Sequence, residues 1–405
     1  MPASESIPET MAAQVIRRER YGPPRQAFQP ERLAVPRPGP GEVLVRVMAA
    51  GVNPNGVYAA LGHPLDVIAA HQRDGVALDH HVTGSDASGV VAATGPGVQR
   101  VHAGDAVVLH GGVWDLACEH VRAGGDPALS PSMRAWGYET PWGSFAEYAL
   151  AQEHQCLPKP ARLSWEEAAA FMICAATVWR MLRRWEPHVV QPGDLVLVWG
   201  GAGGLGCQAI QIVNACGGRA VAVVSSEERA AFCAGLGAVG CVDRRRFSHW
   251  GRMPDVRDVP AHAEWLREAR RFRDAVREAG GGRDLPRIVL EHPGEDTLAT
   301  SVFTCAPGGM VVTCAGTSGY AGSFDLRTAW VLQKRLQGSH GMNDADAAAV
   351  LALVEDGRLQ PCVGRVYRFD EVALAHQLLH ENRQPPGHLV VLIGAVAAGL
   401  GRTAS

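Results

Sequence analysis

Apolar residues in the middle of the chain are arranged as in strands that are buried on both faces. Residues 195–199 form an unbroken apolar run, and a glycine-rich loop, residues 200–206, follows directly. A continuous run of this length, without alternation of apolar and polar positions, is typical of a parallel sheet. Residues 207–216 then predict a helix, which ends at Gly217 and Gly218.

The strand, the glycine loop and the helix together have the pattern of a dinucleotide-binding unit. Glycines allow the backbone to approach a pyrophosphate, and the free N–H groups at the start of the helix carry partial positive charge. The alternative is a tight turn without a ligand, but the complete strand–loop–helix–strand unit argues against it. We therefore expect the following residues to bind the cofactor: Gly201, Ala202, Gly203, Gly204, Leu205 and Gly206.

The end of the next predicted strand, residues 219–224, indicates which dinucleotide binds. NAD-dependent enzymes place an acidic residue at this position, where it holds the ribose 2′-hydroxyl. Here the first residues are Ser225 and Ser226, and Arg229 follows. Small hydroxyls and an arginine fit a 2′-phosphate, so we expect NADPH. The neighbouring acidic pair, residues 227–228, argues in the opposite direction.

Short strands separated by glycine and proline turns flank this region on both sides. Residues 43–47, 87–91 and 103–108 show the pattern early in the chain, and residues 389–393 show it near the end. Such spacing predicts a β-rich, barrel-like domain. We therefore expect a β-rich domain made of residues 1–168 and 345–405. It is split around an α/β nucleotide-binding domain, residues 169–344, that contains a charged helix over residues 261–279.

The bulk composition excludes several classes of partner. The chain has 405 residues, enough for two or three domains at roughly 150 residues each. Its net charge is −3 and it has no basic block, so neither nucleic acid nor an anionic membrane is the expected partner. No segment approaches the roughly 20 apolar residues that span a bilayer. The 10 cysteines form no C-x-x-C pair, which favours a reducing, cytoplasmic location.

Several short motifs occur in the order found in the medium-chain dehydrogenase/reductase superfamily, among them residues 89–91, 95–98, 104–107 and the glycine loop. Within that superfamily, the chain resembles crotonyl-CoA carboxylase/reductases and their relatives that act on longer enoyl-CoAs. The matching motifs are Gly84-Ser85-Asp86, Trp136-Gly137-Tyr138-Glu139-Thr140, Glu291-His292-Pro293-Gly294 and residues 334–340.

This resemblance implies a GroES-like catalytic domain split around a Rossmann domain with a doubly wound parallel sheet. It also implies a homodimer or homotetramer. NADPH would deliver a hydride to the β-carbon of an α,β-unsaturated acyl thioester, and the resulting enolate would attack CO2 to give an alkylmalonyl thioester. Whether the acyl group is carried by CoA or by a carrier protein stays open.

The resemblance also assigns site residues. Asn55 and the segment Tyr138-Glu139 would hold CO2, while His340 and Glu139 would hold a bridging water. Each residue has a simpler alternative, because Asn55 could be a turn residue, Glu139 a surface carboxylate and His340 an ordinary core histidine. Two further residues take family positions, Thr177 beside the cofactor and Arg327 near the phosphates of the thioester carrier.

Departures from the family pattern keep other functions open. Zinc-dependent members of the superfamily have a cysteine near the position of Asn55 and a Gly-His-Glu in place of Gly84-Ser85-Asp86, so we expect no zinc. Tyr138 replaces the family phenylalanine, and Pro54 replaces a tyrosine. A non-carboxylating NADPH-dependent enoyl-thioester or quinone reductase is therefore the alternative enzyme. A nucleotide-binding protein without turnover is the alternative from another class.

Overall fold

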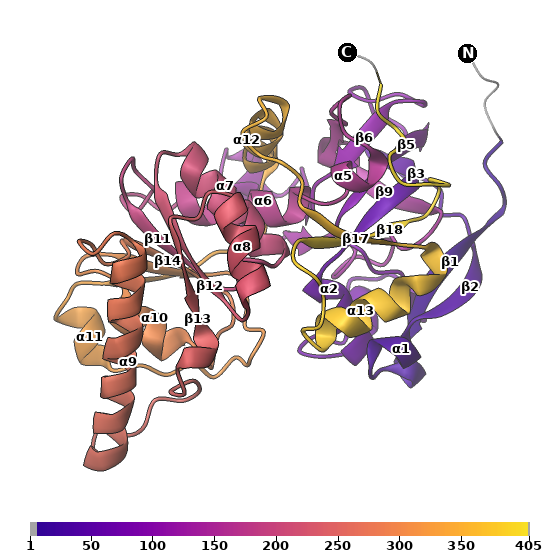
Figure 1. The fold of residues 1–405 in the computed structure, drawn as a ribbon. Coiled ribbons are helices and arrows are strands. Elements are labelled where there is room, and N and C mark those ends of the chain that lie inside the picture. The colour runs from indigo at the N-terminus through magenta and orange to yellow at the C-terminus, as the bar shows by residue number, and fades with distance from the viewer. Residues whose placement is uncertain (1–5, 404–405) are drawn as a thin grey trace. The chain divides into compact units, whose positions relative to one another are not determined.

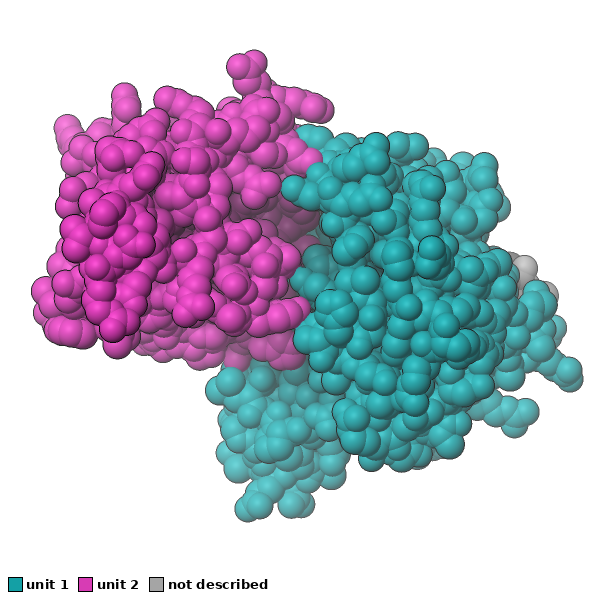
Figure 2. All heavy atoms as spheres, turned by 90° about the horizontal axis from the view of Figure 1, so that it is seen from below, with its two compact units in different colours: residues 1–173, 341–351, 361–405 teal, residues 174–340, 352–360 magenta. Residues whose placement is uncertain are grey.

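The computed structural model describes residues 6–403, which form two compact units (Figure 2). Unit 1 consists of three chain segments, which end at Ile173, run from Gly341 to Leu351 and resume at Pro361. Unit 2 consists of Cys174–His340 and Ala352–Gln360. The chain therefore leaves the first unit, builds most of the second, and returns to complete the first.

The main sheet of unit 1 is built around one long strand, β3 (Glu42–Val52) (Figure 1). The strand order is β10-β6-β5-β3-β18-β17, and β9 also pairs with β3. The other strands of this sheet are β5 (Ala87–Thr94), β6 (Ala106–Leu109), β9 (Tyr148–Gln152), β10 (Cys156–Pro158), β17 (Val363–Tyr367) and β18 (His388–Leu392). Most pairs are antiparallel, as expected for the β-rich domain.

Smaller elements complete unit 1. A three-stranded sheet has the order β2-β1-β4, formed by β1 (Thr10–Arg17), β2 (Gln29–Ala34) and β4 (His80–His81). The two-stranded pair is β7 (Gly112–Val113) with β8 (Arg134–Ala135). The helices are α1 (Pro24–Ala27), α2 (Pro54–Leu61), α3 (Val67–Arg73), α4 (Glu119–Arg122), α5 (Trp165–Ala168) and α13 (Val372–His380).

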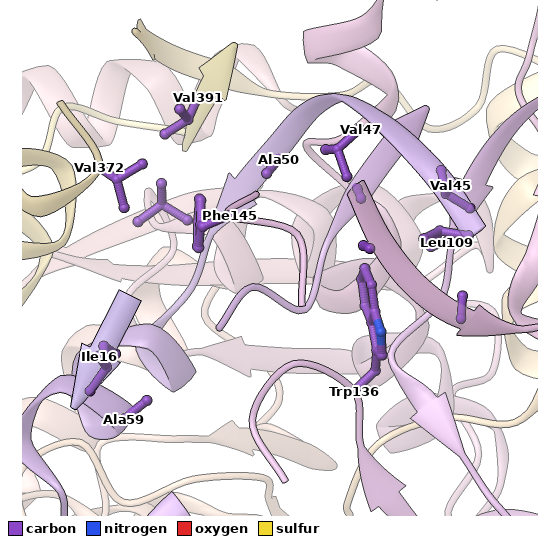
Figure 3. Close-up of a cluster of buried hydrophobic side chains, with 14 of the residues drawn as sticks. Ile16, Val45, Val47, Ala50, Ala59, Leu109, Trp136, Phe145, Val372 and Val391 are labelled. Carbon is purple, nitrogen blue, oxygen red and sulfur yellow. The ribbon is translucent and has the colours of Figure 1, made fainter. Parts of the chain in front are cut away.

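The core of unit 1 collects apolar side chains from strands that are far apart in sequence (Figure 3). Val45 and Val47 of β3, Leu109 of β6 and Val391 of β18 are fully buried in it. Trp136 also lies in this core, and its indole N–H donates to the Leu150 carbonyl at 2.7 Å. Because a buried indole needs an acceptor for its N–H, this bond fixes the loop that follows β8.

Unit 2 contains a six-stranded parallel sheet in the order β13-β12-β11-β14-β15-β16. The predicted apolar run forms β11, whose four residues are all buried. The strands are β11 (Leu195–Val198), β12 (Arg219–Val224), β13 (Gly240–Asp243), β14 (Ile288–Glu291), β15 (Met310–Thr313) and β16 (Arg335–Gly338). The helices are α6 (Met172–Arg183), α7 (Gly204–Ala215), α8 (Glu227–Gly235), α9 (Val259–Ala279), α10 (Leu298–Thr304) and α11 (Leu326–Trp330).

The charged helix predicted from the sequence is α9, which covers the expected segment. Its apolar side buries Phe272 and Val276 against β-strand residues, while Trp265 packs with α10. No helix within residues 6–403 combines the length and the apolar character that a bilayer crossing requires.

The structure places the first passage between units after Ile173, whereas the sequence suggested a boundary after residue 168. Ser164 and Glu167 form a capping box that starts α5, and this short helix ends at Ala168. The following residues stay in unit 1, where the Ile173 N–H donates to Asp86 Oδ1 at 3.2 Å. At the return passage, α12 (Asp344–Glu355) begins in unit 1 and ends in unit 2.

Candidate active site

The glycine loop of unit 2 has the geometry that a dinucleotide requires. Gly200 has a φ of +57°, and a Cβ at Gly201 would lie 2.6 Å from the Cβ of Ala222. Gly206 lies against the Gly200 carbonyl, where a side chain would not fit. Helix α7 starts directly after Gly203, and no side chain caps its first N–H groups. All six predicted loop residues therefore lie at a helix start that can accept a phosphate.

The predicted 2′-phosphate residues lie together at the end of β12. Ser226 is the N-cap of α8, and its Oγ accepts from the Arg229 N–H at 3.2 Å. Ser225 and Arg229 are half-buried beside it, whereas Glu227 and Glu228 are exposed in the first turn of α8. Because Ser226 caps α8, its hydroxyl has a structural role that needs no ligand. We therefore expect Ser225 and the Arg229 side chain to provide the selectivity for NADPH over NADH.

Asn55 lies in the first turn of α2, in unit 1, and is half-buried. Its Nδ2 donates to Ser85 Oγ at 3.3 Å, so the amide contacts the Gly84-Ser85-Asp86 motif directly. Ser85 is only 1% exposed. Ser85 belongs to a motif that matches the family and that argues against zinc, but no sequence pattern predicts its contact with Asn55.

The segment Tyr138-Glu139 is attached to the same motif through Gly137. The Gly137 carbonyl accepts from the Gly84 N–H at 3.1 Å and from Thr83 Oγ1 at 2.6 Å. Tyr138 is half-buried against the core of unit 1. Unit 1 therefore contains three of the four predicted catalytic residues, Asn55, Tyr138 and Glu139, and hydrogen bonds join the two loops to which Ser85 and Tyr138 belong.

Glu139 has a structural partner within its own turn. Its Oε2 accepts from the Ala135 N–H at 2.7 Å, and its own N–H donates to the Ala135 carbonyl at 2.8 Å. The carboxylate is half-buried rather than a free surface group. One carboxylate oxygen is thus used to hold the turn, and the other is left for a further hydrogen bond.

Asp86 adds a buried carboxyl group to the site. It is 0% exposed, and burial raises its pKa well above the usual range of an aspartate. Burial also lowers the pKa of His388 to about 4, so this ring, with Nε2 3.9 Å from Asp86 Oδ2, supplies no positive charge at neutral pH. Burial therefore disfavours the charged form of both Asp86 and His388 beside Asn55.

The remaining predicted residues belong to unit 2. His340 follows β16 and is exposed, and Thr177 is half-buried on α6. Arg327 is exposed on α11, where its Nη2 lies 2.6 Å from Asp325 Oδ2. Because the Arg327 guanidinium already has this carboxylate partner, it is a weaker phosphate ligand than the sequence suggested.

A second polar cluster in unit 1 was not predicted from the sequence. His110 Nε2 and His154 Nδ1 lie 3.0 Å and 2.9 Å from Asp344 Oδ1, at the first residue of α12. His154 Nε2 lies 2.8 Å from Gln152 Oε1, whose amide is oriented by two bonds to the Trp114 backbone. Both His154 nitrogens face acceptors, so both can donate only when the ring carries two protons.

The donor pattern identifies this cluster as an anchor for α12. His110 Nδ1 accepts from the Gly112 N–H at 3.2 Å, which places the ring proton on Nε2, toward Asp344. Burial acts to raise the pKa of Asp344, but the hydrogen bonds from His110 and His154 outweigh it and lower that pKa. The carboxylate is therefore held ionised by its two donors, and together they fix the start of the helix.

Two protein-family models match this chain, one in the β-rich part and one in the nucleotide-binding part. A family model described as the alcohol dehydrogenase GroES-like domain matches residues 39–161, and one described as zinc-binding dehydrogenase matches residues 204–356. The crotonyl-CoA carboxylase/reductase of Cereibacter sphaeroides is 45% identical over 400 residues, covering 99% of this chain and 91% of the relative. The chain belongs to the crotonyl-CoA carboxylase/reductase family.

Solved structures of crotonyl-CoA carboxylase/reductases confirm the predicted fold class. The structure of AntE in complex with NADP is 52% identical, covers 98% of both chains and has a TM-score of 0.93. The structure of the 2-octenoyl-CoA carboxylase reductase CinF, in complex with NADP and 2-octenoyl-CoA, is 36% identical. It covers 98% of this chain and 91% of that chain, with a TM-score of 0.90. The resemblance inferred from short motifs is thus confirmed over nearly the whole chain.

Proposed function

We propose that this protein catalyses the NADPH-dependent reductive carboxylation of an enoyl-CoA to an alkylmalonyl-CoA. The observation that carries the proposal is the contact between Asn55 and Ser85, beside the turn of Tyr138-Glu139. The amide of Asn55 and the hydroxyl of Ser85 are uncharged hydrogen-bonding groups, and by the resemblance they replace the cysteine and the histidine of the zinc-dependent members. CO2 is neutral and only weakly polar, so donors aimed at its oxygens are the groups suited to hold it.

In the proposed reaction, NADPH supplies a hydride to the β-carbon of the enoyl thioester. The α-carbon of the resulting enolate forms a bond to the carbon of CO2, and the new carboxylate takes the negative charge. Asn55 would donate to a CO2 oxygen as charge develops there, and the Tyr138-Glu139 backbone would lie beside it. Glu139, through its second oxygen, and His340 would hold one water. Exclusion of other water would keep the enolate from simple protonation.

Two features support NADPH as the cofactor. Ser225 and Arg229 lie where the ribose 2′-substituent would be read, and the glycine loop provides the start of α7 for the pyrophosphate. NADP is also the cofactor in the solved complexes of AntE and CinF.

The donor set supports a reaction that does not use zinc. Zinc sites are built from thiolates, imidazoles and carboxylates in a tetrahedral set. Asn55 and Ser85 offer an amide and a hydroxyl, and the adjacent Asp86 carboxyl is buried with a raised pKa. This set does not fit zinc.

We propose a CoA thioester as the substrate, with the acyl chain length left open. The structure of CinF holds 2-octenoyl-CoA, which supports a CoA thioester in a close relative. Arg327 is paired with Asp325, so a phosphate of the carrier would compete with this carboxylate for the guanidinium.

We also propose that the protein forms a homodimer or homotetramer through the edge of the unit 2 sheet. Within the described residues, β16 pairs only with β15, and Leu336 of this edge strand is 42% exposed. Trp330 and Val331, just before it in the chain, are 64% and 60% exposed. An open edge beside exposed apolar side chains is stabilised by a partner. Light scattering should give the mass of two or four chains, and the mass of one chain would contradict the proposal.

The overall proposal is tested by product analysis. The protein should oxidise NADPH with crotonyl-CoA and give ethylmalonyl-CoA when bicarbonate and carbonic anhydrase are present. Without bicarbonate it should give butyryl-CoA. A metal chelator should change neither result, because no step depends on zinc. Butyryl-CoA as the sole product at saturating bicarbonate would show a non-carboxylating reductase.

One observation favours that alternative reductase. Glu139 uses one oxygen to hold its own turn, and the Tyr138 hydroxyl adds polarity where the family has phenylalanine. A site that admits an additional water would protonate the enolate. The same product assay separates the two functions.

A further inference from the structure

Ser85 is a buried hydroxyl with a single hydrogen bond to a side chain, and that side chain is Asn55. Ser85 Oγ accepts from Asn55 Nδ2 at 3.3 Å, and Ser85 is 1% exposed. A primary amide has two N–H donors and one carbonyl acceptor on opposite sides. The contact with Ser85 uses one N–H of this amide and so ties the Asn55 side chain to the motif.

The backbone that carries Asn55 is fixed independently of Ser85. The next residue, Gly56, lies against Nε2 of His376 on α13, where a Cβ would not fit. His376 is itself fixed, because its Nδ1 donates to the Val372 carbonyl at 2.8 Å. Burial lowers the pKa of His376 to about 4, so the ring stays neutral and packs against α2 without adding charge.

The backbone that carries Ser85 is also fixed. Gly84 has a φ of +118° and donates to the Gly137 carbonyl, and its own carbonyl accepts from the Ser144 N–H at 3.0 Å. On the other side, the Asp86 carbonyl accepts from the Gly51 N–H at 3.1 Å. With both backbones held, the rotation of the Asn55 side chain is the freedom that remains, and the Ser85 hydroxyl restricts it.

We propose that Ser85 is the positioning residue that orients the Asn55 amide for CO2. This inference rests on the proposed function, because it assigns a role in the carboxylation step. Ser85 holds one N–H of Asn55, which leaves the second N–H as the donor to a CO2 oxygen. Without the hydroxyl, the amide loses this tether, its side-chain torsions become free, and the second N–H is no longer held in one place for CO2. Ser85 thus acts through Asn55 and controls the product, not the hydride step.

The test compares the ratio of carboxylated to reduced product in four proteins: wild type, Ser85→Ala, Asn55→Ala and the double variant. Ser85→Ala should lower the ratio by about twofold to tenfold, the range of one neutral hydrogen bond, at an unchanged rate of NADPH oxidation. In the Asn55→Ala background the same change should have almost no further effect, because the side chain that Ser85 orients is gone.

Ser144→Ala is the matched control. Ser144 is 0% exposed, lies against Gly84, and its Oγ has no hydrogen-bond partner among the described residues. This variant removes a buried hydroxyl from the same region and should leave the product ratio unchanged. Ser85→Thr retains the hydroxyl, so recovery of the ratio in that variant would further support orientation by hydrogen bonding.

The outcomes separate this inference from the proposed function. If wild type makes no carboxylated product, both are wrong. If wild type carboxylates and Ser85→Ala has an unchanged ratio, only the role of Ser85 is wrong. Equal effects of Ser85→Ala in the wild-type and Asn55→Ala backgrounds would also contradict it, because Ser85 would then act independently of Asn55. The comparison stays valid if a variant yields less folded protein, because the ratio of the two products does not depend on enzyme concentration.

Discussion

Asn55→Ala should change the product of the enzyme far more than its rate of NADPH oxidation. Hydride transfer precedes the choice between CO2 and a proton, so loss of a group that holds CO2 affects only the later step. Removal of one donor at a site of developing charge costs about 2–4 kcal/mol. We expect the variant to give mainly the simple reduced acyl thioester, measured by mass spectrometry at saturating bicarbonate.

His340→Ala should act in the same direction, because His340 and Glu139 would hold the same water. Tyr138→Phe, which restores the family residue, is the matched comparison and should carboxylate as well as wild type or better. If Asn55→Ala loses reduction and carboxylation to the same extent, Asn55 positions the thioester or the cofactor instead of CO2.

Arg229→Glu should change cofactor preference by a large factor. A guanidinium that contacts the 2′-phosphate becomes a carboxylate that repels it, whereas NADH has no phosphate at this position. Hydrogen bonds to charged groups contribute about 1.5–3 kcal/mol, so kcat/KM for NADPH should fall by tenfold or more, with little change for NADH.

The control for Arg229→Glu is the same charge change on another helix of unit 2, Arg267→Glu. Arg267 is an exposed arginine on α9, where it pairs with Glu264. Steady-state kinetics with both cofactors should be unaffected by that variant. If Arg229→Glu lowers kcat/KM equally for NADPH and NADH, Arg229 does not bind the 2′-phosphate.

The parts of the fold that depend on local pattern could be predicted from the sequence. The apolar run before the glycine loop became β11, and the charged amphipathic segment became α9. The boundary expected after residue 168 coincides with the end of α5 and not with the passage between the units. Local capping fixes where a helix begins, whereas tertiary contacts such as the Ile173–Asp86 bond decide where the chain leaves one unit for the other.

The candidate site shows the same limit. Motif order was enough to name Asn55, Tyr138 and Glu139, but no spacing rule connects Asn55 with Ser85, since only the packing of α2 on the motif loop brings them together. The anchor of His110, His154 and Asp344 was missed for the same reason, because its members come from three distant segments. Arg327 was named by position, and its pairing with Asp325 appears only in the structure.

The place of β18 in the sheet of unit 1 determines the order in which the chain folds during synthesis. β18 pairs with residues Ala49–Val52 of β3, although it is made after all six strands of unit 2. Until β18 has been made, residues Ala49–Val52 of β3 form an open, apolar strand edge. Such an edge can pair with other nascent chains and so promote aggregation. The sheet of unit 2 can close while the C-terminal segment is still on the ribosome. The sheet of unit 1 can be completed only after β18 has left the ribosome, which is later than the synthesis of every strand of unit 2.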